Sequence, residues 1–190
     1  MKQFIAFIIF STLLAIINNK IMTTKDKWVN DLITLAKSKS EYRNKWPYNV
    51  LYYDGYKWYG DCVNIMKALF NGRDINNKKK DSYQHNLSNT GDITCYGMIQ
   101  ACTEVSSNFN LLKAGEPRIL WMEEHIGAYL GKEIKLGKGI ANVVECTGAW
   151  ERGILFSYVD RDGTRRYAKG NGSVRGRWLK HGKPSKWVQY

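Results

Sequence analysis

The sequence predicts an α+β domain in which N-terminal helices pack on a C-terminal antiparallel sheet. Apolar residues recur at helical spacing in the first half of the chain, and after Pro117 the pattern changes to an alternation of apolar and polar residues. When helices come first and strands follow, an α+β domain with helices packed on an antiparallel sheet is favoured over alternating β-α-β units with a parallel sheet. The chain has 190 residues, 44% of them hydrophobic and 24% charged, so we expect one domain with a substantial core.

The first expected helix runs from Thr23 to Lys37. Thr23 and Asp26 have the spacing of a capping box, with Asp in place of the usual Glu or Gln. One apolar face is formed by residues at helical spacing, namely Trp28, Leu32, Leu35 and Ala36. The next stretch, residues 38–60, is aromatic and interrupted by Pro and Gly, so we expect an irregular segment that packs over the core or walls a groove.

Two shorter helices are expected after this stretch. Asp61 to Phe70 carries an apolar stripe and is followed by Asn71-Gly72, a helix stop. Residues 71–92 are polar, which indicates a long surface loop. Residues 95–105 have the pattern of a short helix with three sulfur-containing residues on one face: Cys95, Met98 and Cys102.

Five strands are expected beyond Pro117, separated by Gly and charged residues. They are Arg118–Leu130, Ala141–Thr147, Ile154–Asp160, Arg165–Ala168 and Trp178–Val188. The sequence Asp-Arg-Asp-Gly-Thr at residues 160–164 predicts a hairpin turn. We find no internal repeat, and we expect residues 23–190 to form a single domain.

The N-terminus has the pattern of a secretory signal. Lys2 precedes Phe4 to Ile17, an apolar run without any charge. A comfortable membrane span needs about 20 residues, so this run is short for one. We expect residues 1–20 to be a signal peptide, with an uncleaved membrane anchor as the alternative. The expected location is therefore extracellular, or the lumen of a secretory or digestive compartment.

The chain is strongly basic, and much of the charge lies near the C-terminus. The formal net charge is +12, and residues 161–190 contain nine Lys and Arg against one acid, Asp162. A basic surface attracts polyanions. Because a secretory signal argues against nucleic acid as partner, anionic cell wall fits better, and a solvated basic face without a specific partner is the alternative.

Cys62 is the leading candidate for a nucleophile. It lies at the start of the second expected helix, directly after Asp61, a favourable N-cap residue. The partial positive charge at a helix N-terminus lowers the pKa of a thiol and favours the reactive thiolate. The alternative is a buried structural cysteine, which is the commoner role of a lone Cys beside a helix.

A cysteine nucleophile usually needs a histidine as base. His85 lies in the polar loop and His181 in a basic turn, whereas His125 lies on an expected strand, which is a rigid support. If this strand pairs with the next across a loop at 132–138, His125 faces Glu145, which could orient the imidazole. A slip of one residue in this register would favour Asn142 instead.

Three segments, in this order, resemble the NlpC/P60 family of cell-wall peptidases. They are Gly60-Asp61-Cys62 at a helix start, His125 to Gly131 with the sequence His-Ile-Gly-Ala-Tyr-Leu-Gly, and Val143 to Thr147 with the sequence Val-Val-Glu-Cys-Thr. The family's strand typically reads His-x-Gly-x-Tyr-x-Gly, the most specific part of the likeness, which spans residues 40–150. The resemblance implies a papain-like core, permuted so that the catalytic Cys helix precedes the sheet.

The resemblance also implies a reaction and a set of site residues. Cys62 would attack an amide carbonyl to form an acyl-enzyme, with His125 as base and Glu145 as the third residue. Three residues are expected to bind substrate: Tyr42, with Tyr59 as its alternative, and Asp61. The implied substrates are stem peptides of bacterial peptidoglycan, cut between D-glutamate and the following diamino acid, with no metal or cofactor.

Two departures from the family leave the subfamily and the cleaved bond open. The family usually has Ser-Gly after the Cys where this chain has Val63-Asn64, and Glu145 is charged where the family has His, Asn or Gln. The alternatives are a CHAP-type N-acetylmuramoyl-L-alanine amidase, a wall-binding module without activity, and a basic protein that acts on nucleic acid or anionic membrane. The other cysteines, expected to be core residues that bind no metal, are Cys95, Cys102 and Cys146. A monomer is the default expectation.

Overall fold

The computed structural model describes residues 22–43, 51–78, 87–137, 139–168 and 172–190. Within these ranges the chain has a mixed α+β fold with a large antiparallel sheet, as the sequence predicts. The expected signal peptide, residues 1–20, lies outside the described residues. None of the helices in the described ranges is both long enough and apolar enough to cross a membrane.

The helices are α2 (Lys25–Lys37), α3 (Cys62–Phe70), α4 (Cys95–Gln100) and the 3-10 helix η1 (Phe109–Leu111). The N-cap of α2 is Thr24, whose side chain accepts a hydrogen bond from the backbone N–H of Lys27, and not Thr23 as expected. Thr23 pairs instead in a short parallel ladder, β1 (Thr23–Thr24) with β13 (Val188–Gln189). The expected helix at 95–105 is too long, because residues 103–106 form a strand in which Glu104 has a φ of 49°.

Among the described residues, the large sheet has eight strands in the order β11-β10-β9-β8-β7-β6-β12-β5, and every pair is antiparallel. The bounds are β5 (Thr103–Ser106), β6 (Arg118–Met122), β7 (His125–Leu136), β8 (Gly139–Thr147), β9 (Gly153–Val159), β10 (Thr164–Tyr167), β11 (Val174–Arg177) and β12 (Lys180–Lys183). The expected hairpin turn at 160–164 joins β9 to β10. The single strand expected at 118–130 is in fact β6 and the start of β7, which a tight turn at 123–124 separates.

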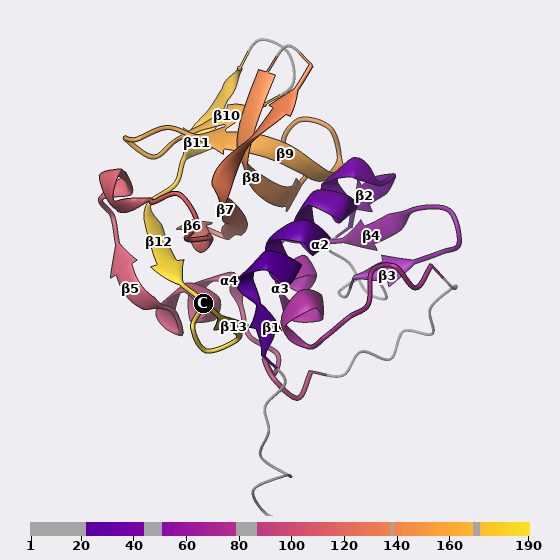
Figure 1. Ribbon diagram of the computed structural model, residues 1–190. Helices are drawn as coiled ribbons and strands as arrows, with labels where there is room; N and C mark the ends of the chain where they lie inside the picture. The colour runs from indigo at the N-terminus through magenta and orange to yellow at the C-terminus, as the bar shows by residue number, and fades with distance from the viewer. Residues whose placement is uncertain (1–21, 44–50, 79–86, 138, 169–171) are drawn as a thin grey trace, which may run out of the picture.

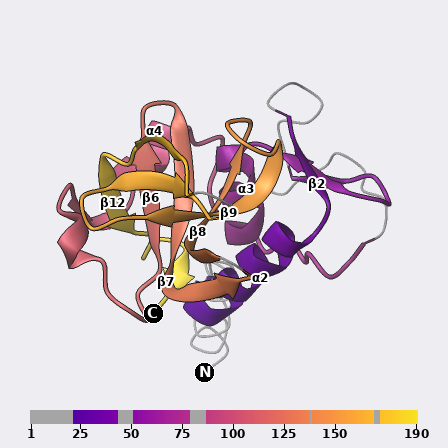
Figure 2. The same cartoon turned by 90° about the horizontal axis from the view of Figure 1, so that it is seen from above.

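Residues 38–60, expected to be irregular, contain a second sheet. It consists of β2 (Ser40–Tyr42), β4 (Trp58–Gly60) and β3 (Tyr52–Tyr53), with β4 in the centre. Aromatic side chains support it, since the stacked rings of Tyr52 and Tyr59 lie 6.1 Å apart and the tilted rings of Tyr53 and Trp58 lie 4.9 Å apart. Figures 1 and 2 show α2 and α3 between this small sheet and the large one.

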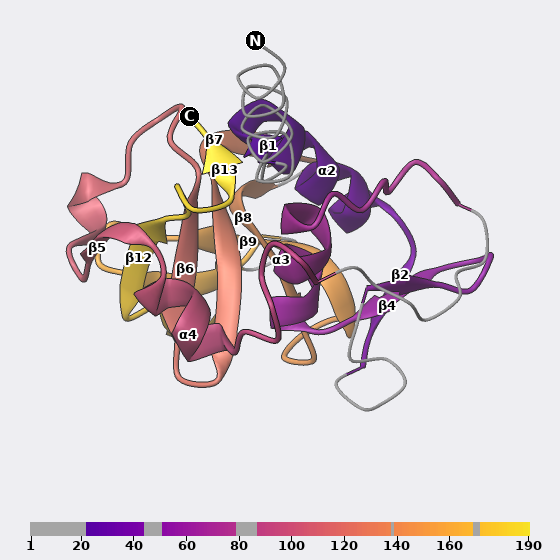
Figure 3. The same ribbon diagram turned by 90° about the horizontal axis from the view of Figure 1, so that it is seen from below.

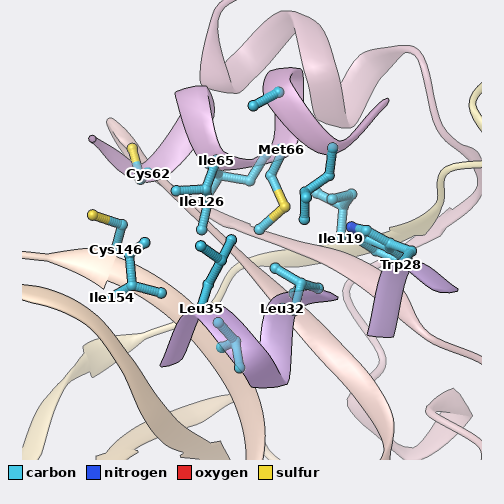
Figure 4. Close-up of a cluster of buried hydrophobic side chains, with 14 of the residues drawn as sticks. Trp28, Leu32, Leu35, Cys62, Ile65, Met66, Ile119, Ile126, Cys146 and Ile154 are labelled. Atoms are coloured by element: carbon cyan, nitrogen blue, oxygen red, sulfur yellow. The ribbon is translucent and has the colours of Figure 1, made fainter. Parts of the chain in front are cut away.

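Two hydrophobic clusters lie on the two faces of the large sheet. The larger packs α2 and α3 against β7 and β8, and Figure 4 shows side chains from these elements converging, among them Leu32, Leu35, Ile65, Met66 and Ile126. The smaller contains Phe109, Leu120, Val143, Val159 and Trp178. Because side chains alternate along a strand, neighbouring residues of β7 face different clusters.

The register between β7 and β8 differs from the expected one by two residues. Glu145 lies opposite Gly127, not opposite His125. The expected register assumed a loop at 132–138, but β7 continues to Leu136 and contains an irregularity between Tyr129 and Ile134 that shifts the pairing. A shift of two residues leaves each side chain on its original face, so His125 and Glu145 remain diagonal neighbours.

Candidate active site

Three elements bring Cys62, His125 and Glu145 together. Cys62 is the first residue of α3, His125 is the first residue of β7, and Glu145 lies in β8. Helix α3 packs against both strands, so the start of the helix meets the start of β7. Figure 3 shows α3 and α4 beside the strands β6 and β7.

Asp61 caps α3 and thereby fixes the backbone that carries Cys62. Its Oδ1 accepts hydrogen bonds from the backbone N–H groups of Val63 at 3.1 Å and Asn64 at 2.8 Å, and its Oδ2 accepts one from Asn64 Nδ2 at 2.6 Å. A cap of this kind contributes about 1 kcal/mol to helix stability. Since both carboxylate oxygens are engaged, the expected contact of Asp61 with substrate stays a prediction that this geometry does not favour.

Glu145 holds the imidazole of His125 from behind. His125 Nε2 lies 2.6 Å from Glu145 Oε2, and Glu145 has no exposed surface. This contact leaves Nδ1 as the ring nitrogen that can exchange a proton with Cys62. Asn142, the alternative third residue, is engaged elsewhere, because its side-chain amide bonds to the backbone N–H and C=O of Val159.

Arg165, which the sequence analysis missed, holds Glu145 from the other side. Its Nε donates to both carboxylate oxygens of Glu145 at 3.0 Å, and its Nη2 donates to Glu145 Oε2 and to Thr147 Oγ1. The guanidinium lies over the ring of Trp150 at 4.4 Å and that of Trp178 at 5.6 Å. A buried carboxylate is stabilised by a cationic partner. A buried Glu145 therefore implies a basic residue nearby, but the sequence does not show which one.

Trp178 packs on the imidazole ring of His125. Its ring stacks on that of His125, with centroids 5.4 Å apart and an interplanar angle of 19°. A Cβ atom at Gly127 would lie only 2.8 Å from Trp178 Cη2, so a side chain there would collide with the indole. The glycine in the His-Ile-Gly segment therefore makes room for the ring that packs on His125.

The buried charges shift the pKa values of the pair in opposite directions. Burial lowers the pKa of His125, but interactions with Cys62 and Glu145 outweigh burial and raise it to about 9. Burial raises the pKa of Glu145, but the hydrogen bond and charge of His125 and the charge of Arg165 outweigh it and lower it to about 2. The carboxylate of Glu145 therefore stabilises the protonated, imidazolium form of His125.

A second cysteine, Cys95, contacts Cys62. The two Sγ atoms lie 3.4 Å apart, and each lies 4.0 Å from the carbonyl oxygen of Glu124. Cys95, expected to face the core with Cys102, packs against the edge of the larger hydrophobic cluster but is only partly buried, because α4 presents it to the start of α3 and ends before Cys102.

This contact changes the acidity of both thiols. The hydrogen bond between Cys62 and Cys95, together with burial, raises the pKa of Cys62, although the interaction with His125 lowers it. The same hydrogen bond lowers the pKa of Cys95. The net direction for Cys62 is opposite to the depression expected from its place at a helix N-terminus.

The remaining cysteines are buried, as expected. Cys146 donates to the carbonyl of Gly60 at 3.3 Å, and Cys102 donates to that of Met98 at 3.3 Å. All four cysteines are free thiols. Within the described ranges, no group of three or more His, Cys, Asp and Glu side chains is arranged to hold a metal ion.

Of the two tyrosine candidates, Tyr42 lies at the site. Burial raises the pKa of Tyr42, and the charges of Cys62 and Asp61 raise it further, which places its phenol within electrostatic reach of both. Tyr59 instead donates its hydroxyl to Asp54 Oδ2 at 2.8 Å in the small sheet. These charge interactions favour Tyr42 over Tyr59 as the residue that borders the cluster.

His181, the other histidine within the described ranges, is engaged away from Cys62. His181 is fully buried, and its Nε2 bonds to the carbonyl of Asn108 at 3.0 Å. His85 lies outside the described residues.

By its fold and its site, the protein is an α+β domain in which a Cys–His–Glu cluster lies where the start of a helix meets an antiparallel sheet. A thiol, a base and an orienting carboxylate are the groups that acyl transfer through a cysteine requires. Comparison with models of protein families, with curated proteins and with solved structures finds no match to this chain.

Proposed function

We propose that this protein is a secreted cysteine peptidase of the NlpC/P60 type, which hydrolyses stem peptides of bacterial cell wall. The observation that carries the proposal is the contact of His125 with both Cys62 and the buried Glu145. The likeness of the segments around these three residues to the family supplies the substrate class.

The proposed reaction uses each member of the cluster once. His125 takes the thiol proton at Nδ1, and the buried carboxylate of Glu145 stabilises the imidazolium that forms. The Cys62 sulfur attacks the amide carbonyl carbon, the C–N bond breaks, and the imidazolium protonates the leaving amine. His125 then takes a proton from water, whose oxygen attacks the thioester, and the free thiol returns with release of the acid. Glu145 keeps the ring oriented throughout.

The order of elements supports the permuted papain-like arrangement that we propose with it. The helix carrying Cys62 precedes the strand carrying His125, and the strand carrying Glu145 comes next. Because α3 packs on β7 and β8, the nucleophile and the base lie on different elements that the larger core holds against each other.

Digestion of purified peptidoglycan and of soluble stem peptides tests the proposal. Wild type, Cys62→Ala and the control Cys102→Ala are compared, and products are read by mass spectrometry. We expect new peptide fragments from wild type and Cys102→Ala but none from Cys62→Ala, with masses that match cleavage after D-glutamate.

Each other result points to a different function. Release of intact stem peptide from muramic acid would replace the peptidase by a CHAP-type amidase. Equal products from wild type and Cys62→Ala would exclude Cys62 as nucleophile. Retained wall binding without any product from wild type would mean a binding module.

A further inference from the structure

The pair of cysteines at the helix starts is not needed for a peptidase mechanism based on Cys62, His125 and Glu145. Cys95 nevertheless places its sulfur 3.4 Å from that of Cys62, from an element 33 residues further along the chain. Cys62 is 7% exposed, whereas Cys95 is partly exposed and adjoins Tyr96, which is 50% exposed. Solvent-borne reagents can thus reach the pair from the Cys95 side.

We infer that Cys62 and Cys95 form an oxidisable pair, which a peroxide converts to an intramolecular disulfide. A disulfide has an S–S distance of about 2.05 Å and needs side chains directed at one another. The two sulfurs lie 3.4 Å apart, and each lies 4.0 Å from the carbonyl oxygen of Glu124. Rotation of the two side chains can therefore bring the sulfurs together while α3 and α4 remain in place.

The chemistry balances with hydrogen peroxide as the oxidant. The thiolate of Cys95 attacks one peroxide oxygen, the O–O bond breaks, hydroxide leaves, and a sulfenic acid forms. The thiol of Cys62 then attacks the sulfenic sulfur, the S–S bond forms, the S–O bond breaks, and water leaves. In total two thiols and one peroxide give one disulfide and two waters. Cys95 is suited to the first step because its hydrogen bond with Cys62 lowers its pKa.

The disulfide has a functional consequence that rests on the proposed peptidase function. A Cys62 sulfur bonded to Cys95 cannot attack an amide, so the oxidised protein is a latent enzyme. A small dithiol regenerates both thiols by thiol–disulfide exchange. Cys95 also protects the nucleophile, because a lone oxidised Cys62 would continue to sulfinic acid, which thiols do not reduce.

The experiment treats reduced, purified protein with hydrogen peroxide. Free thiols are alkylated, the protein is digested, and mass spectrometry measures the peptide that links Cys62 to Cys95, lighter by two hydrogen atoms than its reduced parts. Activity is measured on the same samples before peroxide, after peroxide and after dithiothreitol. The variants are Cys95→Ser, Cys95→Ala and the control Cys102→Ala, each checked for folding by thermal unfolding.

We expect wild type and Cys102→Ala to gain the linked peptide and to lose activity in parallel, with dithiothreitol reversing both changes. Both Cys95 variants should form no such peptide, and peroxide should inactivate them irreversibly with Cys62 as sulfinic acid. Alkylation of both thiols after peroxide, or a reversible loss in the Cys95 variants equal to that of wild type, would overturn the inference. Formation of the link in a protein that cleaves no substrate would leave the pair standing and reject the peptidase.

Discussion

Glu145 carries its charge in a fully buried position, where isolated charges are strongly unfavourable. Two groups compensate for it: His125 at 2.6 Å and the Arg165 guanidinium, whose Nε lies 3.0 Å from both oxygens. Arg165 thus acts through Glu145 as a positioning residue for His125. The buried charge of Glu145 is accommodated because Arg165 is present.

Substitution of Glu145 by Gln tests this charge balance. The variant leaves Arg165 buried without a counter-charge, so we expect the free energy of unfolding to fall by about 3–5 kcal/mol. The pKa of His125 should fall from about 9 toward the ordinary value of 6.5. Urea unfolding and NMR titration of the imidazole measure the two effects.

The double variant Glu145→Gln/Arg165→Met is the control, since it removes both charges. It should be more stable than Glu145→Gln alone. If instead the double variant loses as much free energy of unfolding as Glu145→Gln and Arg165→Met lose together, the two residues do not act as a pair.

The shifted pKa values also predict how stability depends on pH. His125 has a raised pKa in the folded protein, so its contribution is complete below its ordinary value of 6.5 and is lost as pH rises toward about 9. Glu145 has a lowered pKa, so its contribution is complete above its ordinary value of 4.5 and is lost as pH falls toward about 2. Thermal unfolding should therefore show greatest stability between these two ordinary values.

The variant His125→Gln separates the loss of stability at high pH from the loss at low pH. It should lose the decline on the alkaline side, because the group that titrates there is gone. An unchanged alkaline limb in this variant would assign that decline to another group.

At the scale of elements, local signals were sufficient for α3 and insufficient for the pairing of β7. The Asp61 cap and the Asn71-Gly72 stop act within a few residues, and the helix lies where the sequence predicts it. The register of β7 depends on an irregularity between Tyr129 and Ile134 that alternation alone does not reveal. The prediction that His125 and Glu145 share a face survived because an error of two residues preserves the face.

Long-range partners were the part that the sequence could not supply. Arg165 and Cys95 reach the site through tertiary packing, 20 and 33 residues from the groups they contact. The three short strands of the small sheet likewise depend on stacked aromatic side chains such as Tyr52 and Tyr59. Neither period nor spacing encodes these contacts, because each depends on how separate elements meet.

Gly127 links the β7 strand to the ring that packs on His125, and Gly127→Ala tests that link. A Cβ atom there would approach Trp178 Cη2 to 2.8 Å, so the indole must move. We expect a loss of about 1–3 kcal/mol in the free energy of unfolding, as for other overpacked cores. Near-UV circular dichroism should report the displaced Trp178, and activity should fall with it.

Gly148→Ala is the matched control. Its Cβ atom would meet Tyr42 at 3.4 Å, an ordinary contact, and Gly148 is exposed. Its stability should stay near that of wild type. Equal losses in the two variants would mean that glycine flexibility, and not the space for Trp178, is what matters at Gly127.

At the scale of the whole molecule, positive charge gathers on an outer strand of the large sheet. Strand β11 (Val174–Arg177) is first in the sheet order and exposed along its whole length, with Arg175 and Arg177 on it. Arg161 is exposed in the neighbouring turn. With a net charge of +12, this surface is suited to bind a polyanion, which under the proposed function is the anionic cell wall.

Salt should therefore affect two substrates differently. Raising the ionic strength from about 0.02 M to about 0.3 M shortens the screening length to below about 10 Å and weakens contacts between exposed charges. Digestion of insoluble wall should slow strongly over this range, whereas cleavage of a soluble stem peptide should change little. The variant Arg161→Gln/Arg175→Gln should lose part of the salt dependence on wall and keep its rate on the soluble peptide. Equal salt dependence on both substrates would place the electrostatic effect at the cluster itself, where Arg165 and His125 are the buried cations.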